Sequence, residues 1–336
     1  MYFEILFLLL ITYFMHQILM KFAKFVNLID NPNERSIHIS PTIRGFGIVI
    51  FVSIGITLLV FEPIMFIQNT NLLSAVLLIG ILGLIDDVKG TPPLIKILTL
   101  IVVYLFLYAD GFLISYLGVY LGISIDLNLY LAIIFSTAAI VAFTNAFNII
   151  DGLDGLSGLI AMIIFFTFLF LGLENNDKLL TTIPIFFITT LFVFLIYNWN
   201  PAKVFLGDSG SLMIGFVISI LGIRSLNYIE PISILFIASV PIIDALFVYS
   251  RRILEGKPPF MPDKLHCHHI LLAYFKHNVK KTVLIIASFQ FISSLVGVCY
   301  FANLNDSFFA LLFFLFLFFA VFKILIRIRV NLNQEA

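Results

Sequence analysis

Five aspartates stand among glycines at the points where long apolar runs of the chain end. A charged side chain beside a membrane-spanning run is costly to desolvate, so such residues are presumptively functional. Their repeated placement indicates one polar site assembled from several loops. The five are Asp86 and Asp87, which are adjacent, Asp151 and Asp154 in Asn-Ile-Ile-Asp-Gly-Leu-Asp-Gly-Leu, and Asp208 in Val-Phe-Leu-Gly-Asp-Ser-Gly-Ser.

The composition identifies the class of protein that must position these acids. Of 336 residues, 61% are hydrophobic and 11% charged, and the mean hydropathy is +1.12. Several runs approach the ~20 residues that cross ~30 Å of hydrocarbon as a helix. We expect an all-α polytopic membrane protein, a single domain over 1–336, with about 10–11 transmembrane helices. The expected spans are roughly 2–20, 45–61, 71–85, 94–109, 129–145, 156–173, 179–197, 210–224, 231–250, 282–301 and 307–326.

The lysines and arginines of the connections predict the orientation. With the N-terminus outside, the outer face keeps only Lys178 and Arg224, while seventeen Lys and Arg residues collect on the inner face. The acid-bearing loops fall on that basic side, which indicates one cytoplasmic site. The outer segment 110–128 has the β-branched and aromatic content of a small hairpin.

The sequence does not favour a signal peptide, a disulfide or nucleic-acid binding. Met1 to Phe25 lacks a basic start and an Ala-x-Ala site, so it is expected to be a retained helix rather than a signal peptide. Cys267 and Cys299 lie far apart, so a disulfide is not expected. The net charge is zero, which does not favour nucleic-acid binding.

The Asp86–Asp87 pair shares its loop with two lysines, Lys89 and Lys96. Carboxylates beside cations could act as a general base, or could order a phosphate that the lysines hold. The alternative is a solvated loop in which acids and lysines pair at the membrane interface.

Asn148, Asp151 and Asp154 recur every three residues, so a helical or turn-like course brings them toward one side. Oxygen ligands with flexible glycines suit Mg²⁺, which keeps its waters and bridges substrate phosphates. The alternative is a capping and turn segment. Asp208 opens the next span, where helix amides favour an anion or where the residue simply caps the helix.

Three histidines, His266, His268 and His269, stand within four residues in a cationic loop. With Cys267 they could form a zinc site, although adjacent residues rarely close one tetrahedron. Contact with a diphosphate, or action as an acid, is the interpretation that the loop favours.

Together these segments resemble the polyprenyl-phosphate N-acetylhexosamine-1-phosphate transferase family, over about residues 30–272. The resemblance implies transfer of a sugar 1-phosphate from a UDP-sugar to a lipid phosphate, with release of UMP. Its motifs are Asp30-Asn-Pro-Asn-Glu-Arg-Ser-Ile-His38, Arg44-Gly-Phe-Gly47, Asp86-Asp87, Asn148 to Asp154, Asn198 to Asp208, and Pro262-Asp-Lys-Leu-His-Cys-His-His269.

The resemblance also implies roles for individual residues and partners. It places Mg²⁺, with Mn²⁺ as a substitute, on Asn148 and Asp208. Catalytic roles fall on Asp86, Asp87 and the three histidines. Binding of substrate falls on Asp30, Arg44, Lys96, Asp151, Asp154, Asn198 and Phe205, with uracil stacked on Phe205. The partners are polyprenyl phosphate, a UDP-N-acetylhexosamine and the bilayer of a bacterial plasma membrane, with a homodimer as one expected assembly.

The histidine motif is similar to the branch that starts O-antigen, enterobacterial common antigen and teichoic acid linkage units, which favours N-acetylglucosamine as the sugar. The peptidoglycan branch, which transfers phospho-N-acetylmuramoyl-pentapeptide, is the second choice. This chain has Phe46 and Cys267 where many relatives have Gly and Ile.

Two other classes remain as alternatives. An ion-coupled transporter also uses intramembrane carboxylates, but its site lies near the midplane and its sequence usually shows a repeat. A non-catalytic scaffold would not need these loops on one side. The identity of the sugar, the polymer that is started, the oligomeric state and the choice between direct attack and a covalent intermediate are not determined by the sequence.

Overall fold

The computed structural model describes residues 2–32, 41–258 and 265–335, and their contacts form two compact units. The expectation of a single domain stays a prediction. Residues 33–40 and 259–264, which include parts of the first and last motifs, lie outside the described residues.

The first unit comprises residues 1–114 and 128–227. Its elements are α1 (Tyr2–Phe22), β1 (Ile29–Asp30), β2 (Thr42–Ile43), α2 (Phe46–Phe61), α3 (Pro63–Gln68), α4 (Thr70–Lys89), α5 (Pro93–Leu107), the 3₁₀ turn η1 (Tyr108–Asp110), α6 (Leu129–Ile150), α7 (Leu156–Glu174), α8 (Lys178–Asn198) and α9 (Asp208–Ser225).

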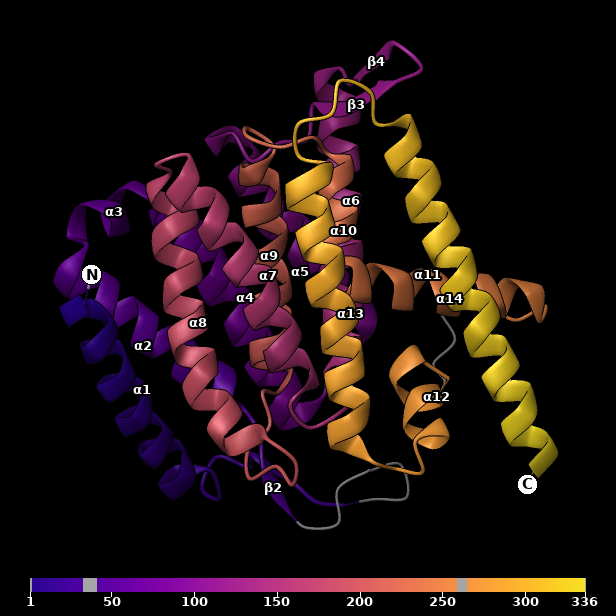
Figure 1. Cartoon of the computed structure of the whole chain (residues 1–336). Coiled ribbons are helices and arrows are strands. Elements are labelled where there is room, and N and C mark those ends of the chain that lie inside the picture. The colour runs from indigo at the N-terminus through magenta and orange to yellow at the C-terminus, as the bar shows by residue number, and fades with distance from the viewer. Residues whose placement is uncertain (1, 33–40, 259–264, 336) are drawn as a thin grey trace. The chain divides into compact units, whose positions relative to one another are not determined.

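The second unit comprises the hairpin and the C-terminal third of the chain (Figure 1). Within it, α11 runs across the direction of α13 and contacts both α13 and α14. Its elements are β3 (Tyr116–Tyr120), β4 (Ile123–Asp126), α10 (Ile232–Ile237), α11 (Ser239–Leu254), α12 (Cys267–Tyr274), α13 (Val279–Tyr300) and α14 (Phe308–Glu335).

The helices confirm an all-α polytopic membrane protein. Among the described residues, 9 helices are long and apolar enough to cross a membrane, and α2, with 16 residues, is apolar but shorter. The expected span 231–250 is instead broken into α10 and α11 at Ala238, where φ is −121° and ψ is 36°. Pro241 lies in the first turn of α11, where its missing amide costs no intrahelical bond, so a new helix can begin there.

Helix α9 is the buried centre of the first unit. Of its 18-residue window, 83% is buried, mainly against α4 and α6. Its first turn is contacted backbone to backbone by two glycines: a Cβ on Gly47 of α2 would lie 2.2 Å from the Gly210 nitrogen, and one on Gly83 of α4 would lie 2.4 Å from the Asp208 carbonyl oxygen. Only glycine permits this approach, so α2 and α4 together locate the start of α9.

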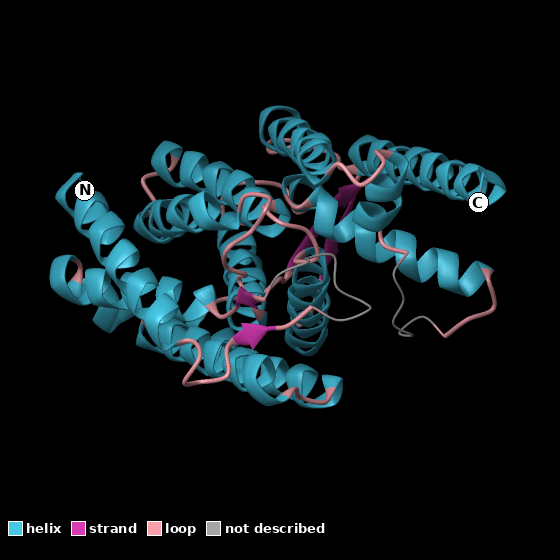
Figure 2. Ribbon diagram, turned by 90° about the horizontal axis from the view of Figure 1, so that it is seen from below, coloured by secondary structure: helices cyan, strands magenta, loops and turns pink. Residues whose placement is uncertain are grey.

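A short antiparallel pair, β1 with β2, lies at one end of the first unit's helices (Figure 2). Ile43 of β2 also bridges to Val204 in parallel, and the Phe205 amide donates to the Ile43 carbonyl at 2.7 Å. These bonds bring the segment 41–45 beside the segment 203–206, which carries the last residues before α9.

The hairpin expected in 110–128 is confirmed as β3 and β4, which pair in antiparallel fashion in the second unit. Leu121 and Gly122 at its turn both have positive φ, 52° and 77°, as tight hairpin turns require.

In the first unit, both cations assigned to the outer face are ion-paired: Lys178 with Glu62 at 2.6 Å, and Arg224 with Asp177 at 2.7 Å. We interpret these two pairs as structural.

Candidate active site

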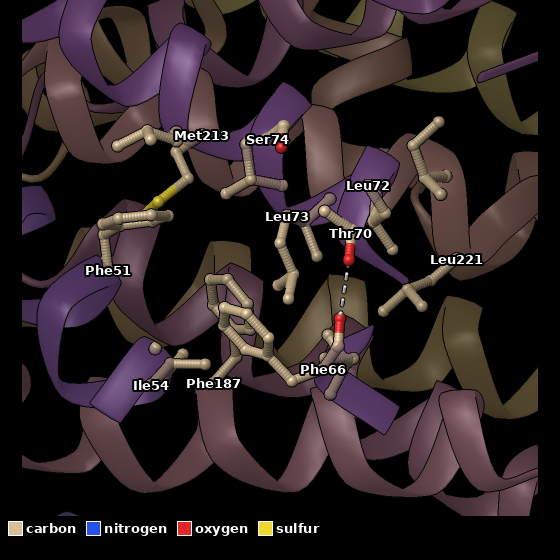
Figure 3. A pocket seen from close by; sticks show the side chains of 16 residues that line it. Phe51, Ile54, Phe66, Thr70, Leu72, Leu73, Ser74, Phe187, Met213 and Leu221 are labelled. Atoms are coloured by element: carbon tan, nitrogen blue, oxygen red, sulfur yellow. Dashed lines mark hydrogen bonds between the residues drawn. The ribbon is translucent and has the colours of Figure 1, made fainter. Parts of the chain in front are cut away.

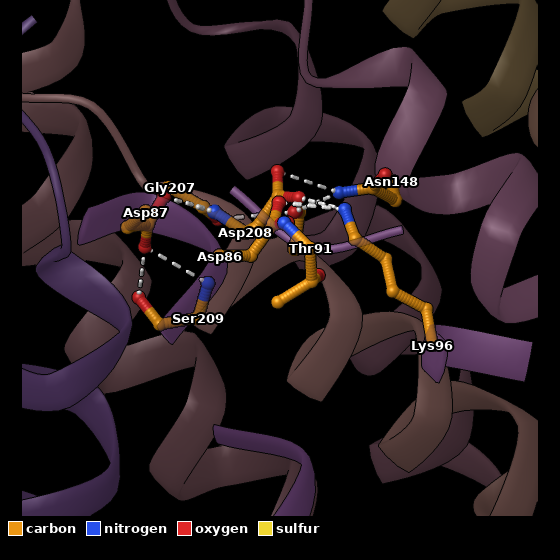
Figure 4. Close-up of polar contacts among 9 residues, drawn as sticks. Asp86, Asp87, Thr91, Lys96, Asn148, Gly207, Asp208 and Ser209 are labelled. Atoms are coloured by element: carbon orange, nitrogen blue, oxygen red, sulfur yellow. Dashed lines mark hydrogen bonds and ion pairs between the residues drawn. The ribbon is translucent and has the colours of Figure 1, made fainter. Parts of the chain in front are cut away.

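Asp86 and Asp87 are neighbours at the end of α4, yet they face different partners, because adjacent helical residues are ~100° apart. Figure 4 shows Asp86 turned toward Thr91 and Lys96. Asp86 Oδ1 accepts the Thr91 amide at 2.6 Å and its hydroxyl at 2.5 Å, while Oδ2 accepts Lys96 Nζ at 2.6 Å. Asp86 is thus the member of the pair that belongs to the charged cluster.

Asp87 is 4% exposed and is directed at the start of α9. Its carboxylate accepts the Asp208 amide at 2.9 Å, and the Ser209 amide and hydroxyl at 3.1 and 2.9 Å. The N-cap residue of α9 is Gly207, which has no side chain, and a Cβ there would lie 2.6 Å from Asp87 Oδ2. A carboxylate on α4 therefore caps α9 across the helix interface and complements its dipole.

Lys96 links the two acids that face the cluster. Its Nζ lies 2.5 Å from Asp208 Oδ2 as well as 2.6 Å from Asp86 Oδ2, and its side chain is 16% exposed. On the other side, Asn148 Nδ2 donates to Asp208 Oδ1 at 3.1 Å and to Ser211 Oγ at 2.7 Å. The structure thus brings together Asp86, Asp208, Asn148 and Lys96, which are far apart in the sequence.

The residues around Asp208 fit a hard divalent cation in their chemistry. Asp208 and Asn148 both carry oxygen donors, and the acids near Lys96 outnumber the cations that contact them. Within the described parts of the chain, no group of three or more His, Cys, Asp or Glu side chains is arranged to hold a metal. Mg²⁺ does not need one, because it keeps several waters and binds substrate phosphates through one or two protein ligands.

Asp154 and Asn198 join the start of α7 to the segment before α9. Asp154 Oδ2 accepts Asn200 Nδ2 at 2.8 Å and the Ala202 amide at 3.0 Å. Asn198 accepts the Gly155 amide and donates to the Val204 carbonyl, both at 2.8 Å. These bonds hold the segment 198–205 in place, so both residues support the half-buried Phe205 through the backbone.

Asp151 is the carboxylate of this group that carries a proton near neutral pH. Burial, followed by the neighbouring charges of Asp208, Asp87 and Asp154, raises the pKa of Asp151 from 3.8 to about 8, against a hydrogen bond that Ser157 donates. A neutral Asp151 reduces repulsion among the acids.

The first motif reaches the same region through its second half. The Arg44 guanidinium acts electrostatically on Asp87, and its amide donates to the Leu28 carbonyl at 3.0 Å. Asp30 is half-buried and pairs with Thr42 in register. Phe46 packs its ring 5.0 Å from that of Phe194, so the departure from glycine there is accommodated by the core.

The histidine motif lies in the second unit. His266 precedes α12, and its Nδ1 lies 2.7 Å from Asp244 Oδ2. The His268 ring lies 5.7 Å from that of His266 and 4.2 Å from that of His269. Burial lowers the pKa of His268 to about 3, so it is neutral at physiological pH. The three histidines and Asp244 are thus a group within the second unit.

Four polar partners were missed by the sequence analysis: Thr91, Ser209, Ser211 and Asp244. The serines stand in the motif around Asp208, but a hydroxyl carries no sequence signal of its partner. Asp244 had a signal, because it is a carboxylate inside the apolar stretch Pro241-Ile-Ile-Asp-Ala-Leu-Phe.

An apolar cavity of about 150 Å³ lies within the first unit, among α2, α4, α8 and α9 (Figure 3). Phe51, Leu73, Phe187 and Met213 contribute to its wall. Leu73 and Asp86 are at opposite ends of α4, so this cavity is separate from the charged cluster. Apart from Thr70 and Ser74 its lining is apolar, which suits hydrocarbon.

In this multi-pass helical protein, acids, a lysine and an asparagine are gathered at one end of the spans. This arrangement is typical of integral membrane enzymes that act on phosphorylated substrates. Comparison with known proteins identifies the family. The model of glycosyl transferase family 4 matches residues 69–226. A probable undecaprenyl-phosphate N-acetylglucosaminyl 1-phosphate transferase of Bacillus subtilis is 30% identical over 278 residues, which cover 81% of this chain and 77% of the relative.

Two further relatives extend the comparison. An undecaprenyl-phosphate alpha-N-acetylglucosaminyl 1-phosphate transferase of Thermotoga maritima is 30% identical over 86% of this chain and 87% of its own length. A phospho-N-acetylmuramoyl-pentapeptide-transferase of Dictyoglomus turgidum is 30% identical over 66% and 74%. The chain belongs to glycosyl transferase family 4, whose members generally depend on a divalent metal ion.

Proposed function

We propose that this chain transfers N-acetylglucosamine 1-phosphate from UDP-N-acetylglucosamine to a polyprenyl phosphate, namely undecaprenyl phosphate, and releases UMP. The observation that carries the proposal is the cluster of Asp208, Asn148, Lys96 and Asp86 at the start of α9. Charged groups of both signs at a helix N-terminus suit the binding of a diphosphate. The names of the relatives from Bacillus subtilis and Thermotoga maritima support the choice of sugar and acceptor.

The reaction balances without a co-reactant. An oxygen of the lipid phosphate attacks the phosphorus that bears the sugar, the bond from that phosphorus to the bridging oxygen breaks, and UMP leaves with the bridging oxygen. The lipid phosphate is already a nucleophile, so positioning and neutralisation of charge can suffice.

The proposal assigns the described residues as follows. Lys96 binds phosphate oxygens, Asp86 orients Lys96, and Asp208 and Asn148 hold Mg²⁺ or its substitute Mn²⁺. When bound, that ion neutralises the diphosphate as charge moves to the departing UMP. Phe205 stacks on uracil, with Asp154 and Asn198 supporting its segment. The contacts of Asp87 favour positioning of α9, and its action as a base on the lipid phosphate stays a prediction.

The proposal includes a membrane orientation. The acid-bearing loops face the cytoplasm of a bacterium, the N-terminus lies outside, and the product starts a lipid-linked surface glycan such as O-antigen or a teichoic acid linkage unit. The distribution of lysine and arginine supports this orientation. Assembly as a homodimer stays a prediction.

The reaction can be tested by its reversal, because one diphosphate is exchanged for another and the equilibrium should lie near unity. Purified enzyme in nanodiscs is given labelled polyprenyl-diphospho-N-acetylglucosamine, Mg²⁺ and excess UMP, and labelled UDP-sugar should appear. Release of free sugar phosphate, or of UDP in the forward direction, would contradict the assignment.

The relative from Dictyoglomus turgidum keeps the peptidoglycan branch as the second candidate. A panel of donors in the forward assay separates the two. Labelled lipid should form from UDP-N-acetylglucosamine and not from UDP-N-acetylmuramoyl-pentapeptide; the reverse preference would favour the second candidate.

A further inference from the structure

Asp244 is a buried carboxylate in the second unit whose two oxygens both have partners. It lies on α11 and is 3% exposed. Oδ2 lies 2.7 Å from His266 Nδ1, and Oδ1 accepts the Cys267 amide at 2.7 Å. A carboxylate removed from water is costly unless it is paired and hydrogen-bonded. Both bonds of Asp244 go to the histidine motif, at His266 and Cys267, and His266 lies 22 positions further along the chain.

One of the two bonds orients the His266 ring, and the other caps α12. His266 is the N-cap residue of α12, with φ −74° and ψ 159°, but its side chain does not cap that helix. The Asp244 carboxylate accepts the first amide of α12 instead, close to the positive end of the helix. The imidazole is therefore not needed for capping and can face a substrate.

The bond from Asp244 to the His266 ring also determines which ring nitrogen carries the proton. A carboxylate accepts hydrogen bonds and cannot donate one when ionised, so the proton of the His266–Asp244 bond is on Nδ1. The second ring nitrogen, Nε2, is then the one available to contact a phosphate or to exchange a proton. A second-shell carboxylate orients catalytic and metal-bound histidines in the same way.

The other two motif histidines differ from His266. His268 is 3% exposed and its low pKa keeps it neutral. His269 contacts His268 ring to ring. The two Asp244 oxygens bond to the His266 ring and to the Cys267 amide, so His266 is the histidine whose ring Asp244 orients.

From these contacts, and resting on the function proposed above, we infer that Asp244 is a positioning residue of the transferase. It holds His266 with Nδ1 protonated and caps α12, so that Nε2 of His266 is the nitrogen that can contact a phosphate group of a substrate.

The first test is a double-mutant cycle with Asp244→Asn, His266→Ala and the two combined. Asn can donate to Nδ1 and so favours the opposite tautomer, and we expect kcat to fall roughly 10²-fold or more, with a smaller change in KM. If Asp244 acts through His266, the combined variant should be no slower than His266→Ala within about threefold. Multiplicative losses would show a separate structural role and overturn the inference.

A matched control removes a capping carboxylate that has no histidine. Asp306, in the same unit, accepts the Phe308 amide at 2.8 Å and the Gly122 amide at 3.0 Å. Asp306→Asn should change kcat little, even if it lowers the unfolding temperature. A loss of kcat equal to that of Asp244→Asn would mean that any lost cap in this unit has the same effect, and would contradict the inference.

The second test does not depend on activity. The chain has 6 histidines, so ¹⁵N spectra of histidine side chains in nanodiscs are simple, and His266→Gln assigns the His266 signals. Wild-type His266 should be protonated on Nδ1, and Asp244→Asn should shift the proton to Nε2. A wild-type His266 protonated on Nε2 alone would overturn the inference even if Asp244→Asn failed to fold. The wild-type tautomer can be measured whether or not the protein transfers N-acetylglucosamine, so failure of the proposed function and of this inference can be told apart.

Discussion

Asp208 shares its carboxylate between Lys96 and Asn148, at 2.5 and 3.1 Å, while its amide is held by Asp87. This residue therefore depends on three other helices for its position. Asp208→Asn should abolish turnover and weaken Mg²⁺ binding, because it removes the charge that attracts the ion. The chain has 1 tryptophan, Trp199, beside Gly155, so its fluorescence can report Mg²⁺-dependent donor binding without activity. Wild-type activity and Mg²⁺ dependence in this variant would show that the ligand is elsewhere.

Asp86 and Asp87 should differ in what their replacement costs. Asp87→Asn turns an amide NH₂ toward backbone N–H groups, so we expect a loss of about 1–3 kcal/mol of stability. Its kcat should fall roughly 10²-fold or more with little change in UDP-sugar affinity. Asp86→Asn is the matched control and should lower turnover with a smaller loss of stability. Thermal unfolding and calorimetry of UDP-sugar binding measure both effects. If Asp87→Asn lost turnover at unchanged stability, Asp87 would act as a base and not as a cap.

Asp151 predicts a dependence of stability on pH. Its pKa is raised from 3.8 to about 8, so the folded chain binds this proton more tightly than the unfolded chain does. The resulting stabilisation is fully present below the unfolded pKa and is lost as pH rises through the folded pKa. The unfolding temperature of the wild type should therefore fall between about pH 4 and pH 8, and that of Asp151→Asn, which stays neutral, should fall less. Parallel curves for the two proteins would contradict a raised pKa.

At the scale of the elements, the start of α9 is located by contacts with α2 and α4 that leave no space for a side chain. Gly83→Ala would place a Cβ 2.4 Å from the Asp208 carbonyl oxygen and the Ser209 Cα. Backbone atoms cannot move aside as a flexible side chain can, so we expect a loss of stability on the order of 1–3 kcal/mol or more, together with activity.

Gly80, on the same helix, is the matched control for Gly83. A Cβ there meets nothing within 4 Å. Gly80→Ala should leave activity unchanged and raise stability by about 0.5–1 kcal/mol through helix propensity. Chemical denaturation and the transfer assay compare the two. Equal stability and activity of the two alanine variants would show that α4 and α9 do not meet as closely as described.

At the scale of the whole molecule, the testable property is orientation in the membrane. In a Cys267→Ile, Cys299→Ser background, cysteines placed at Lys203 and Ile123, which are both exposed, should label from opposite sides. A membrane-impermeant maleimide should reach Lys203→Cys only in inside-out vesicles and Ile123→Cys only in right-side-out vesicles. The reversed pattern would place the charged cluster on the outer face.

The polytopic helical class and the hairpin were predictable from the sequence because hydropathy and turn chemistry are local properties. A run of about 20 apolar residues is committed to a helix in the bilayer whatever its neighbours are. The break at Ala238 was not predicted, because 231–250 is apolar enough on average to be taken as one span, and the break depends on the backbone at a single residue.

The sequence alone determined which kinds of residue form the candidate site and that they collect on one predicted face. Desolvation of a carboxylate is unfavourable, so the few carboxylates beside apolar segments can be recognised as candidate site residues. The tertiary structure decided which partner each carboxylate has. Asp86 faces Lys96 while its neighbour Asp87 caps α9, and Asp244 reaches His266 from another helix. The reason is geometric: the partner of a side chain depends on which helix packs against its face, and spacing along the chain does not encode that packing.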